Sequence, residues 1–108
     1  MTFNEYQSLA NSTDIYPSDK SLDCHILGLA NEAGEVAGKL KKIYRDKDGL
    51  ISPTDVLEIS KELGDVLWYL SCTAYDLEIA LEDIAIMNIN KLADRKERNQ
   101  IGGSGDHR

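Results

Sequence analysis

Apolar residues recur at helical spacing through long segments of this 108-residue chain, and this pattern is the strongest constraint on its fold. In residues 20–45 the apolar positions alternate by four and three without a break: Leu22, Ile26, Leu29, Ala33, Val36, Leu40 and Ile43. Such a series forms one apolar stripe along a helix, suited to packing against a second helix. The chain is also rich in Leu, Ile, Ala, Glu and Lys and has only two prolines, which favours an all-α protein.

The periodic stretches, and the turn residues between them, predict four helices. We expect them over residues 3–12, about 20–45, from Ser52 to a break near residues 76–79, and about 80–98. Pro17 separates the first two, because proline disfavours a helical residue before it. Gly49 is available for a left-handed turn at the end of the second helix. Ser52 caps the third helix, Pro53 occupies its first turn, and Asp55 adds a favourable charge there.

The third predicted helix is apolar around much of its circumference. Its core face comprises Val56, Ile59, Leu63, Val66, Leu67, Leu70 and Ala74. Leu57 and Trp68 lie on roughly the opposite side, so this helix needs cover on more than one side. One small bundle cannot supply that cover. We therefore expect an all-α fold with a four-helix bundle-like core that is completed by oligomerisation.

Composition and charge exclude several classes of function. The net charge of −7 argues against a nucleic-acid partner, because phosphate neutralisation needs a basic face. No apolar run approaches the length of a membrane span, and residues 1–5 lack the character of a signal peptide. Cys24 and Cys72 belong to no Cys-x-x-Cys motif, and we interpret them as reduced thiols of a cytoplasmic protein. We expect one domain over residues 1–101 and a flexible Gly-rich tail over residues 102–108.

Two short acidic motifs lie within the second and third predicted helices. Glu32 and Glu35 are three residues apart, as are Glu62 and Asp65, so each pair points to one side of its helix. On a helical wheel both pairs lie beside the apolar stripe. If the pairs face each other, four carboxylates share a small space, which is tolerable only with cations between them. The alternative is a solvated acidic face, since 29% of the residues are charged.

Two glycines and a histidine near these motifs have structural interpretations. Gly34 and Gly64 lie at the centres of their helices, where each costs about 1 kcal/mol relative to alanine. They predict a close approach between the second and third helices. His25 is interpreted as a residue at the edge of the core and not as a metal ligand, because it has no His or Cys partner.

The fourth predicted helix turns from apolar to basic along one face. Asn88, Lys91 and Arg95 continue the face that begins with Leu81 and Ile84. We expect this basic part to pass the acidic motifs. Lys91 and Arg95 would then either pair with the carboxylates or bind a polyphosphate together with metal ions, and their spacing leaves both open.

With these motifs the chain resembles the MazG-like nucleoside triphosphate pyrophosphohydrolases of the all-α NTP pyrophosphatase superfamily. The resemblance rests on Glu32-x-x-Glu35, Glu62-x-x-Asp65, Asn88-x-x-Lys91-Leu92-x-x-Arg95, Tyr6-Gln7-x-x-Ala10-x-x-Thr13 and the Gly-rich end of the chain. It covers nearly the whole chain. One departure is Glu78, which stands just before the fourth helix where relatives often have glycine.

The resemblance implies a homodimer or homotetramer that hydrolyses a nucleoside or deoxynucleoside triphosphate to a monophosphate and pyrophosphate. It implies that Glu32, Glu35, Glu62 and Asp65 are catalytic and hold Mg²⁺, with Mn²⁺ as a substitute. A triphosphate is compatible with four carboxylates only when divalent ions bridge the two. A metal-activated water would attack the α-phosphorus. Which carboxylate orients that water stays open, and Glu35 is one candidate.

The resemblance also implies contacts to the substrate. Lys91 and Arg95 would hold phosphate oxygens, and Asn88 would bridge phosphate or sugar. Tyr69 is placed to meet the sugar or base, and Gln7 is a weaker candidate for a base contact. The expected role is house-cleaning of nucleotide pools. The alternatives are a non-catalytic helical module that binds a nucleotide or a protein, and a purely structural oligomerisation bundle.

Overall fold

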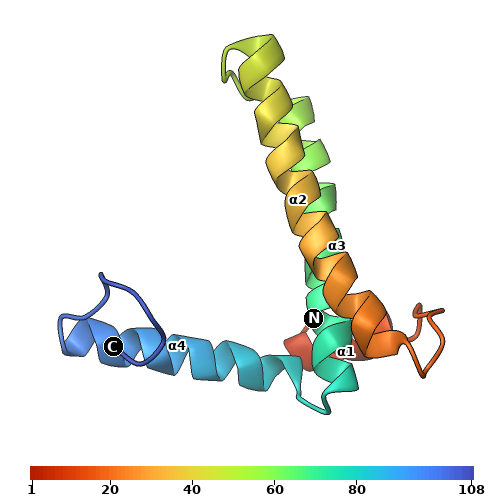
Figure 1. The fold of residues 1–108 in the computed structure, drawn as a ribbon, viewed down its shortest axis with the longest axis vertical. Coiled ribbons are helices and arrows are strands. Elements are labelled where there is room, and N and C mark those ends of the chain that lie inside the picture. Colours follow the sequence, from red (N-terminus) through yellow and green to blue (C-terminus); the bar gives the residue numbers. More distant parts are fainter.

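The computed structural model describes residues 1–108 and contains four helices and no strand. They are α1 (Phe3–Asn11), α2 (Ser21–Lys47), α3 (Pro53–Asp76) and α4 (Leu81–Glu97), shown in Figure 1. The all-α prediction is confirmed, and the predicted helix ends agree with the observed ones to within two residues. No helix combines the length and the apolar character that crossing a bilayer requires.

α2 and α3 pack side by side as an antiparallel hairpin, which forms the long arm of the molecule (Figure 1). Asp48 and Gly49 end α2 in left-handed backbone, with φ values of 53° and 78°. Ser52 then caps α3 as predicted. Its hydroxyl oxygen accepts from the Asp55 N–H, and the Asp55 carboxylate accepts from the Ser52 N–H. Local sequence signals therefore determine both sides of the turn that makes the two helices antiparallel.

The joint between α3 and α4 is held by α1. The Gln7 side chain donates to the Ile79 carbonyl oxygen (2.9 Å) and accepts from the Leu81 N–H (3.0 Å). The predicted break between the last two helices is confirmed here. Glu78 adopts φ 58°, a left-handed conformation in which glycine has no steric penalty. Glycine, the residue that the family resemblance leads us to expect here, would adopt this conformation without steric cost.

Side-chain burial is concentrated at the end of the hairpin that α1 covers, which we call the base: α1, residues 12–20, the first turns of α2 and the last turns of α3. Of the nine buried residues, all but Ile43 and Arg95 lie at the base or directly beside it at Leu81. The largest fully buried side chains are His25, Cys72 and Ser71. The single-chain core is thus small and lies at one end of the arm.

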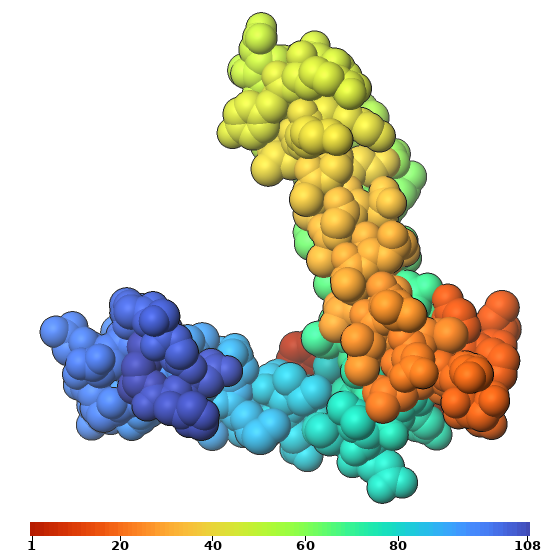
Figure 2. Space-filling view, viewed as in Figure 1, coloured from red at the N-terminus to blue at the C-terminus, as the bar shows by residue number.

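α4 leaves the base and extends away from the arm, so the chain has an open L shape (Figures 1 and 2). It has no packing contact with α2. The radius of gyration is 16.7 Å, whereas a compact domain of about 100 residues has a value of about 13 Å. Within one chain, then, α4 does not close a bundle with the other helices. Self-association remains a prediction.

The last residues of the chain fold back along α4 (Figure 1). Asp106 contacts the Lys91 Nζ (3.1 Å) and the Arg95 Nη2 (3.3 Å) through its carboxylate. The Arg98 guanidinium donates to the Arg108 carbonyl oxygen (2.7 Å). The tail therefore has defined partners in this conformation, and the division into a domain and a flexible tail stays a prediction.

Candidate functional site

Three of the four motif carboxylates converge where α2 and α3 face each other. Glu32, Glu62 and Asp65 each place a carboxylate oxygen within 4.8 Å of the others. Glu62 and Asp65 share one side of α3 because they are three residues apart, and antiparallel packing puts Glu32 of α2 beside them. The Lys39 ammonium lies 3.8 Å from Glu62 and supplies one nearby positive charge.

The electrostatics of this carboxylate cluster favour a bound cation. The pKa of Glu32 is raised, first by partial desolvation and then by a hydrogen bond with Glu62 and by the charges of Asp65, Glu62 and Glu35. Like charges this close cannot all ionise without cost, and either a proton or a cation relieves the repulsion. Three carboxylate oxygens from two rigid helices are donors that a hard divalent ion prefers. The donor set therefore fits Mg²⁺.

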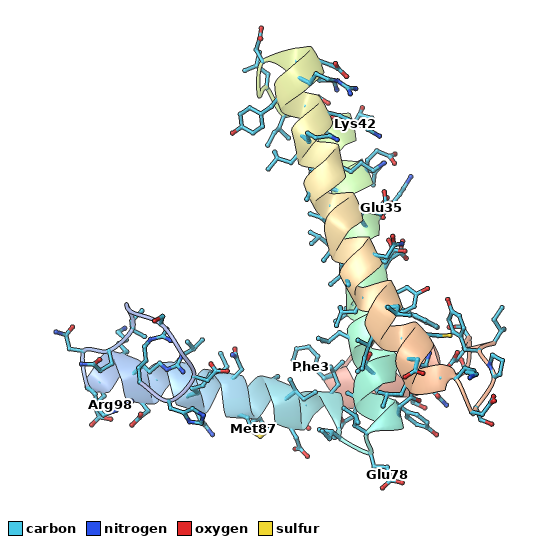
Figure 3. All side chains as sticks on the ribbon, in the orientation of Figure 1. Phe3, Glu35, Lys42, Glu78, Met87 and Arg98 are labelled. Carbon is cyan, nitrogen blue, oxygen red and sulfur yellow. The ribbon has the colours of Figure 1, made fainter.

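Glu35 lies beside the cluster without joining it. It is exposed on the arm, as Figure 3 shows, and follows Glu32 by about one turn of α2. Its charge still acts on Glu32. The structure thus separates the fourth motif acid from the three that meet.

The predicted close approach at the central glycines is wrong. A Cβ atom added to Gly34 or Gly64 would meet no atom within 4 Å. The close approach occurs instead at Gly28, where a Cβ would overlap the Tyr69 ring. Gly28 lies one turn before Glu32, and Tyr69 lies one turn after Asp65, so antiparallel packing sets them at the same level. The spacing of Gly28 and Tyr69 from the acidic motifs could therefore have predicted this contact from the sequence.

Tyr69 lies between the carboxylate cluster and the base. Its hydroxyl shares a hydrogen bond of 2.8 Å with the Tyr16 hydroxyl. This bond, burial and the nearby charges of Tyr16, Glu32 and Asp65 raise the pKa of Tyr69 to about 12. The phenol is therefore neutral at physiological pH and can donate or accept a hydrogen bond next to the acids. Its predicted contact with sugar or base stays a prediction.

His25 lies inside the core of the base and not at its edge. Its side chain is fully buried. Its Nδ1 lies 2.6 Å from Asp76 Oδ2, and its Nε2 lies 3.0 Å from Asp14 Oδ2. The rings of Tyr16 and Trp68 meet it edge-on. Sequence reasoning missed both carboxylates, because Asp76 is 51 residues away and Asp14 lies in a loop without periodicity.

The basic residues of α4 do not reach the carboxylate cluster of the same chain. α4 has no contact with α2, and Lys91 and Arg95 pair with Asp106 of the tail. The expectation that this face passes the acids is therefore wrong for a single chain. Arg95 is almost fully buried, whereas Asn88 is exposed. Their roles toward a substrate stay predictions.

Gln7 is engaged in the fold. Its amide oxygen and nitrogen bond to the α3–α4 joint, and its side chain is buried. A contact from this side chain to a base would need a rearrangement of that joint. The substrate role of Gln7 stays a prediction.

Comparisons with known proteins identify the family of the chain. Residues 20–99 match the MazG nucleotide pyrophosphohydrolase domain. The chain is 45% identical to the Gene 37 protein of Mycobacterium phage L5 over 109 aligned positions, which cover 95% of this chain and 96% of the phage protein. No solved structure matches the chain. The family match spans α2, α3 and α4, with the carboxylate cluster inside it, and the chain therefore belongs to the MazG nucleotide pyrophosphohydrolase domain family.

Proposed function

We propose that this protein hydrolyses a nucleoside or deoxynucleoside triphosphate to a monophosphate and pyrophosphate in a Mg²⁺-dependent reaction. The observation that carries the proposal is the convergence of Glu32, Glu62 and Asp65 within 4.8 Å of one another. Family membership supports nucleotide pyrophosphohydrolase chemistry. The proposed setting is the cytoplasm, where the enzyme would remove unwanted nucleotides.

The three clustered carboxylates would hold the metal. When bound there, Mg²⁺, or Mn²⁺ in its place, neutralises phosphate charge and makes water a better nucleophile. The helical spacing of Glu62 and Asp65 keeps their oxygens on one side of α3, and Glu32 approaches from α2. Because both helices are long and mutually packed, these donors are held in place before the substrate arrives.

Glu35 is suited to handle the proton. It is exposed one turn from the cluster, so its carboxylate is free to accept a hydrogen bond from the attacking water. As the water oxygen bonds to the α-phosphorus, Glu35 takes the proton, and the bond to the bridging oxygen breaks. The products are the monophosphate and pyrophosphate. Tyr69, neutral and adjacent, would contact the sugar or base.

Lys91, Arg95 and Asn88 would bind the phosphates from another copy of the chain. In a single chain α4 does not reach the cluster. In the proposed homodimer or homotetramer, α4 of a neighbouring copy would bring its basic face to the acids. The exposed apolar residues of the arm and α4 supply a surface for such an assembly.

A panel of nucleoside and deoxynucleoside triphosphates, incubated with and without Mg²⁺, tests the proposal by pyrophosphate release. Glu62→Gln should lower kcat/KM by at least about 100-fold. Loss of a residue that only hydrogen-bonds to a metal ligand already lowers metal affinity or activity by about 10- to 100-fold, and Glu62 would be a ligand itself. Glu58→Gln, one turn away on α3, is the matched control and should retain activity. The proposal fails if no nucleotide releases pyrophosphate, or if Glu62→Gln and Glu58→Gln behave alike.

Calorimetry separates the enzyme from the non-catalytic alternative. Metal-dependent nucleotide binding without turnover in the wild type would identify a binding module on the same scaffold.

A further inference from the structure

A second group of potential metal ligands lies in the base, apart from the carboxylate cluster. Asp14, His25 and Cys72 each offer one ligand atom, and these atoms lie within 4.8 Å of one another. They come from three separate parts of the chain: residues 12–20, α2 and α3. His25 and Cys72 are buried, and Asp14 closes the group from the loop side.

The hydrogen bonding of His25 leaves its Nε2 without a donor or acceptor. Nδ1 lies 2.6 Å from Asp76 Oδ2 and therefore donates its hydrogen to that carboxylate. The Ser21 hydroxyl also donates to Asp76 (2.9 Å) and holds the carboxylate in place. In the neutral imidazole Nε2 then carries a lone pair. This atom is fully buried and has no hydrogen-bond partner.

The position of Asp14 sharpens this point. Its Oδ2 lies 3.0 Å from Nε2, yet the two atoms do not form a hydrogen bond. Two electron-rich atoms this close inside the protein repel each other unless a proton or a metal cation lies between them, and the absence of hydrogen-bond geometry argues against a shared proton. Two ligands of one ion approach each other in this way, because each directs its lone pair at the ion and not at the other ligand. A carboxylate on the far nitrogen is the usual partner of a metal-binding histidine.

We propose that Asp14, His25 and Cys72 form a binding site for a Zn²⁺-class ion, with Asp76 orienting the imidazole. An imidazole nitrogen, a thiolate and a carboxylate suit Zn²⁺ or Co²⁺ and do not suit Mg²⁺, which prefers oxygen ligands. The Asp14 side chain is 13% exposed, so solvent reaches that edge and can supply a fourth ligand.

Such an ion would anchor residues 12–20 to α2 and α3. The same segment carries Tyr16, whose hydroxyl bonds to the Tyr69 hydroxyl (2.8 Å) beside the carboxylate cluster. Thr13 of this segment accepts a hydrogen bond from Trp68 (2.8 Å). The site would therefore hold the loop that orients Tyr69, without being part of the carboxylate cluster itself.

Cobalt absorption of the full-length protein tests the proposal directly. One equivalent of Co²⁺ should give a thiolate-to-cobalt charge-transfer band in the near ultraviolet. Cys72→Ser should abolish this band, whereas Cys24→Ser, the matched control at the other free cysteine, should keep it. Excess Mg²⁺ should leave the band unchanged, and Zn²⁺ should remove it. Glu62→Gln should also keep the band. The two proposals can therefore fail separately, because pyrophosphate release tests the proposed function and the cobalt band tests the second metal site.

Thermal unfolding and a second set of variants test the proposal even if the Cys72→Ser variant misfolds. Saturating Zn²⁺ should raise Tm by roughly 10 °C. Asp14→Asn, on the loop side, should lose both the cobalt band and this shift while keeping a wild-type circular dichroism spectrum. Asp76→Asn should weaken Co²⁺ binding by about 10- to 100-fold. The proposal is overturned if the wild type shows neither the band nor the shift.

Discussion

The base and the rest of the molecule differ in how much of their apolar surface one chain can bury. At the base, α1 and residues 12–20 cover the hairpin, and His25, Ser71 and Cys72 are fully enclosed. Along the arm, Val56 and Leu63 remain about half exposed, and so does Ile86 on α4. The base therefore contains most of the buried core of the single chain, whereas the arm and α4 present surface that further burial would stabilise.

The two regions also carry different side-chain networks. The buried network of His25 lies at the base, while Glu32, Glu62 and Asp65 lie on the arm where the helices are only partly covered. Side chains on rigid but exposed elements remain accessible to a ligand or a second copy. Four experiments test this contrast, and they follow in order of decreasing expected effect.

The first experiment asks whether α4 is covered by another copy. Ile89 of α4 is 64% exposed and Ile15 of the base is 92% exposed. Ile89→Asp should raise the dissociation constant for self-association by roughly 30-fold, because a buried interface anchor is worth about 2 kcal/mol. Ile15→Asp is the control and should leave association unchanged. Sedimentation measures both. Equal behaviour of the two variants, or a monomeric wild type, would contradict a partner on α4.

The second experiment compares two glycines of α2. Gly28→Ala should destabilise the protein by about 1–3 kcal/mol, because its Cβ would overlap the Tyr69 ring. Gly34→Ala should stabilise it by up to about 1 kcal/mol, because alanine favours helix and no atom lies nearby. Urea denaturation measures both changes. If Gly34→Ala is destabilising instead, another copy must pack against that face of the arm.

The third experiment concerns the joint where α4 leaves the base. Glu78→Gly should stabilise the protein by about 1 kcal/mol, because glycine adopts the observed φ of 58° without steric cost. Glu78→Ala removes the same carboxylate and keeps the steric cost, so it should give no such gain. Thermal unfolding compares the two. Equal stability of both variants would show that the joint does not hold this conformation in solution.

The fourth experiment uses the cap at the far end of the arm. The Ser52 N–H, the Lys47 ammonium and the Ser52 hydroxyl lower the pKa of Asp55 to about 2. Because the folded pKa lies below the unfolded value of about 3.9, this stabilisation is complete above that pH. It is lost as the pH falls from about 4 to about 2. Asp55→Asn should make the dependence of the urea midpoint on pH less steep across this window. An unchanged slope would show that the cap is not formed.

Much of the helical structure could be predicted from local sequence. The capping residues Ser52 and Asp55 and the left-handed Gly49 act within a few residues of their own position, so their signals survive without tertiary information. The placement of each acidic pair could also be predicted, since two residues three positions apart lie on the same side of a helix. Their convergence followed from an antiparallel hairpin with a short turn, which leaves few registers for two apolar stripes.

Other parts of the site could not be predicted in this way. The prediction of close packing at Gly34 and Gly64 was wrong, because the depth to which helices interlock depends on the facing side chain, here Tyr69 against Gly28. The direction of α4 depends on Glu78 and on bonds from Gln7, which is distant in sequence. The environment of His25 depends on Asp14 and Asp76, which no periodicity connects to it.

The sequence by itself determined the four helices, their ends and the side of each helix on which the acids lie, because these follow from interactions within one or two turns. Only the tertiary structure decided that three acids meet while Glu35 stands apart, that His25 lies between two carboxylates, and that α4 turns away from the acids of its own chain. Those outcomes depend on contacts between residues distant in sequence, whose geometry is set by packing and not by helical periodicity.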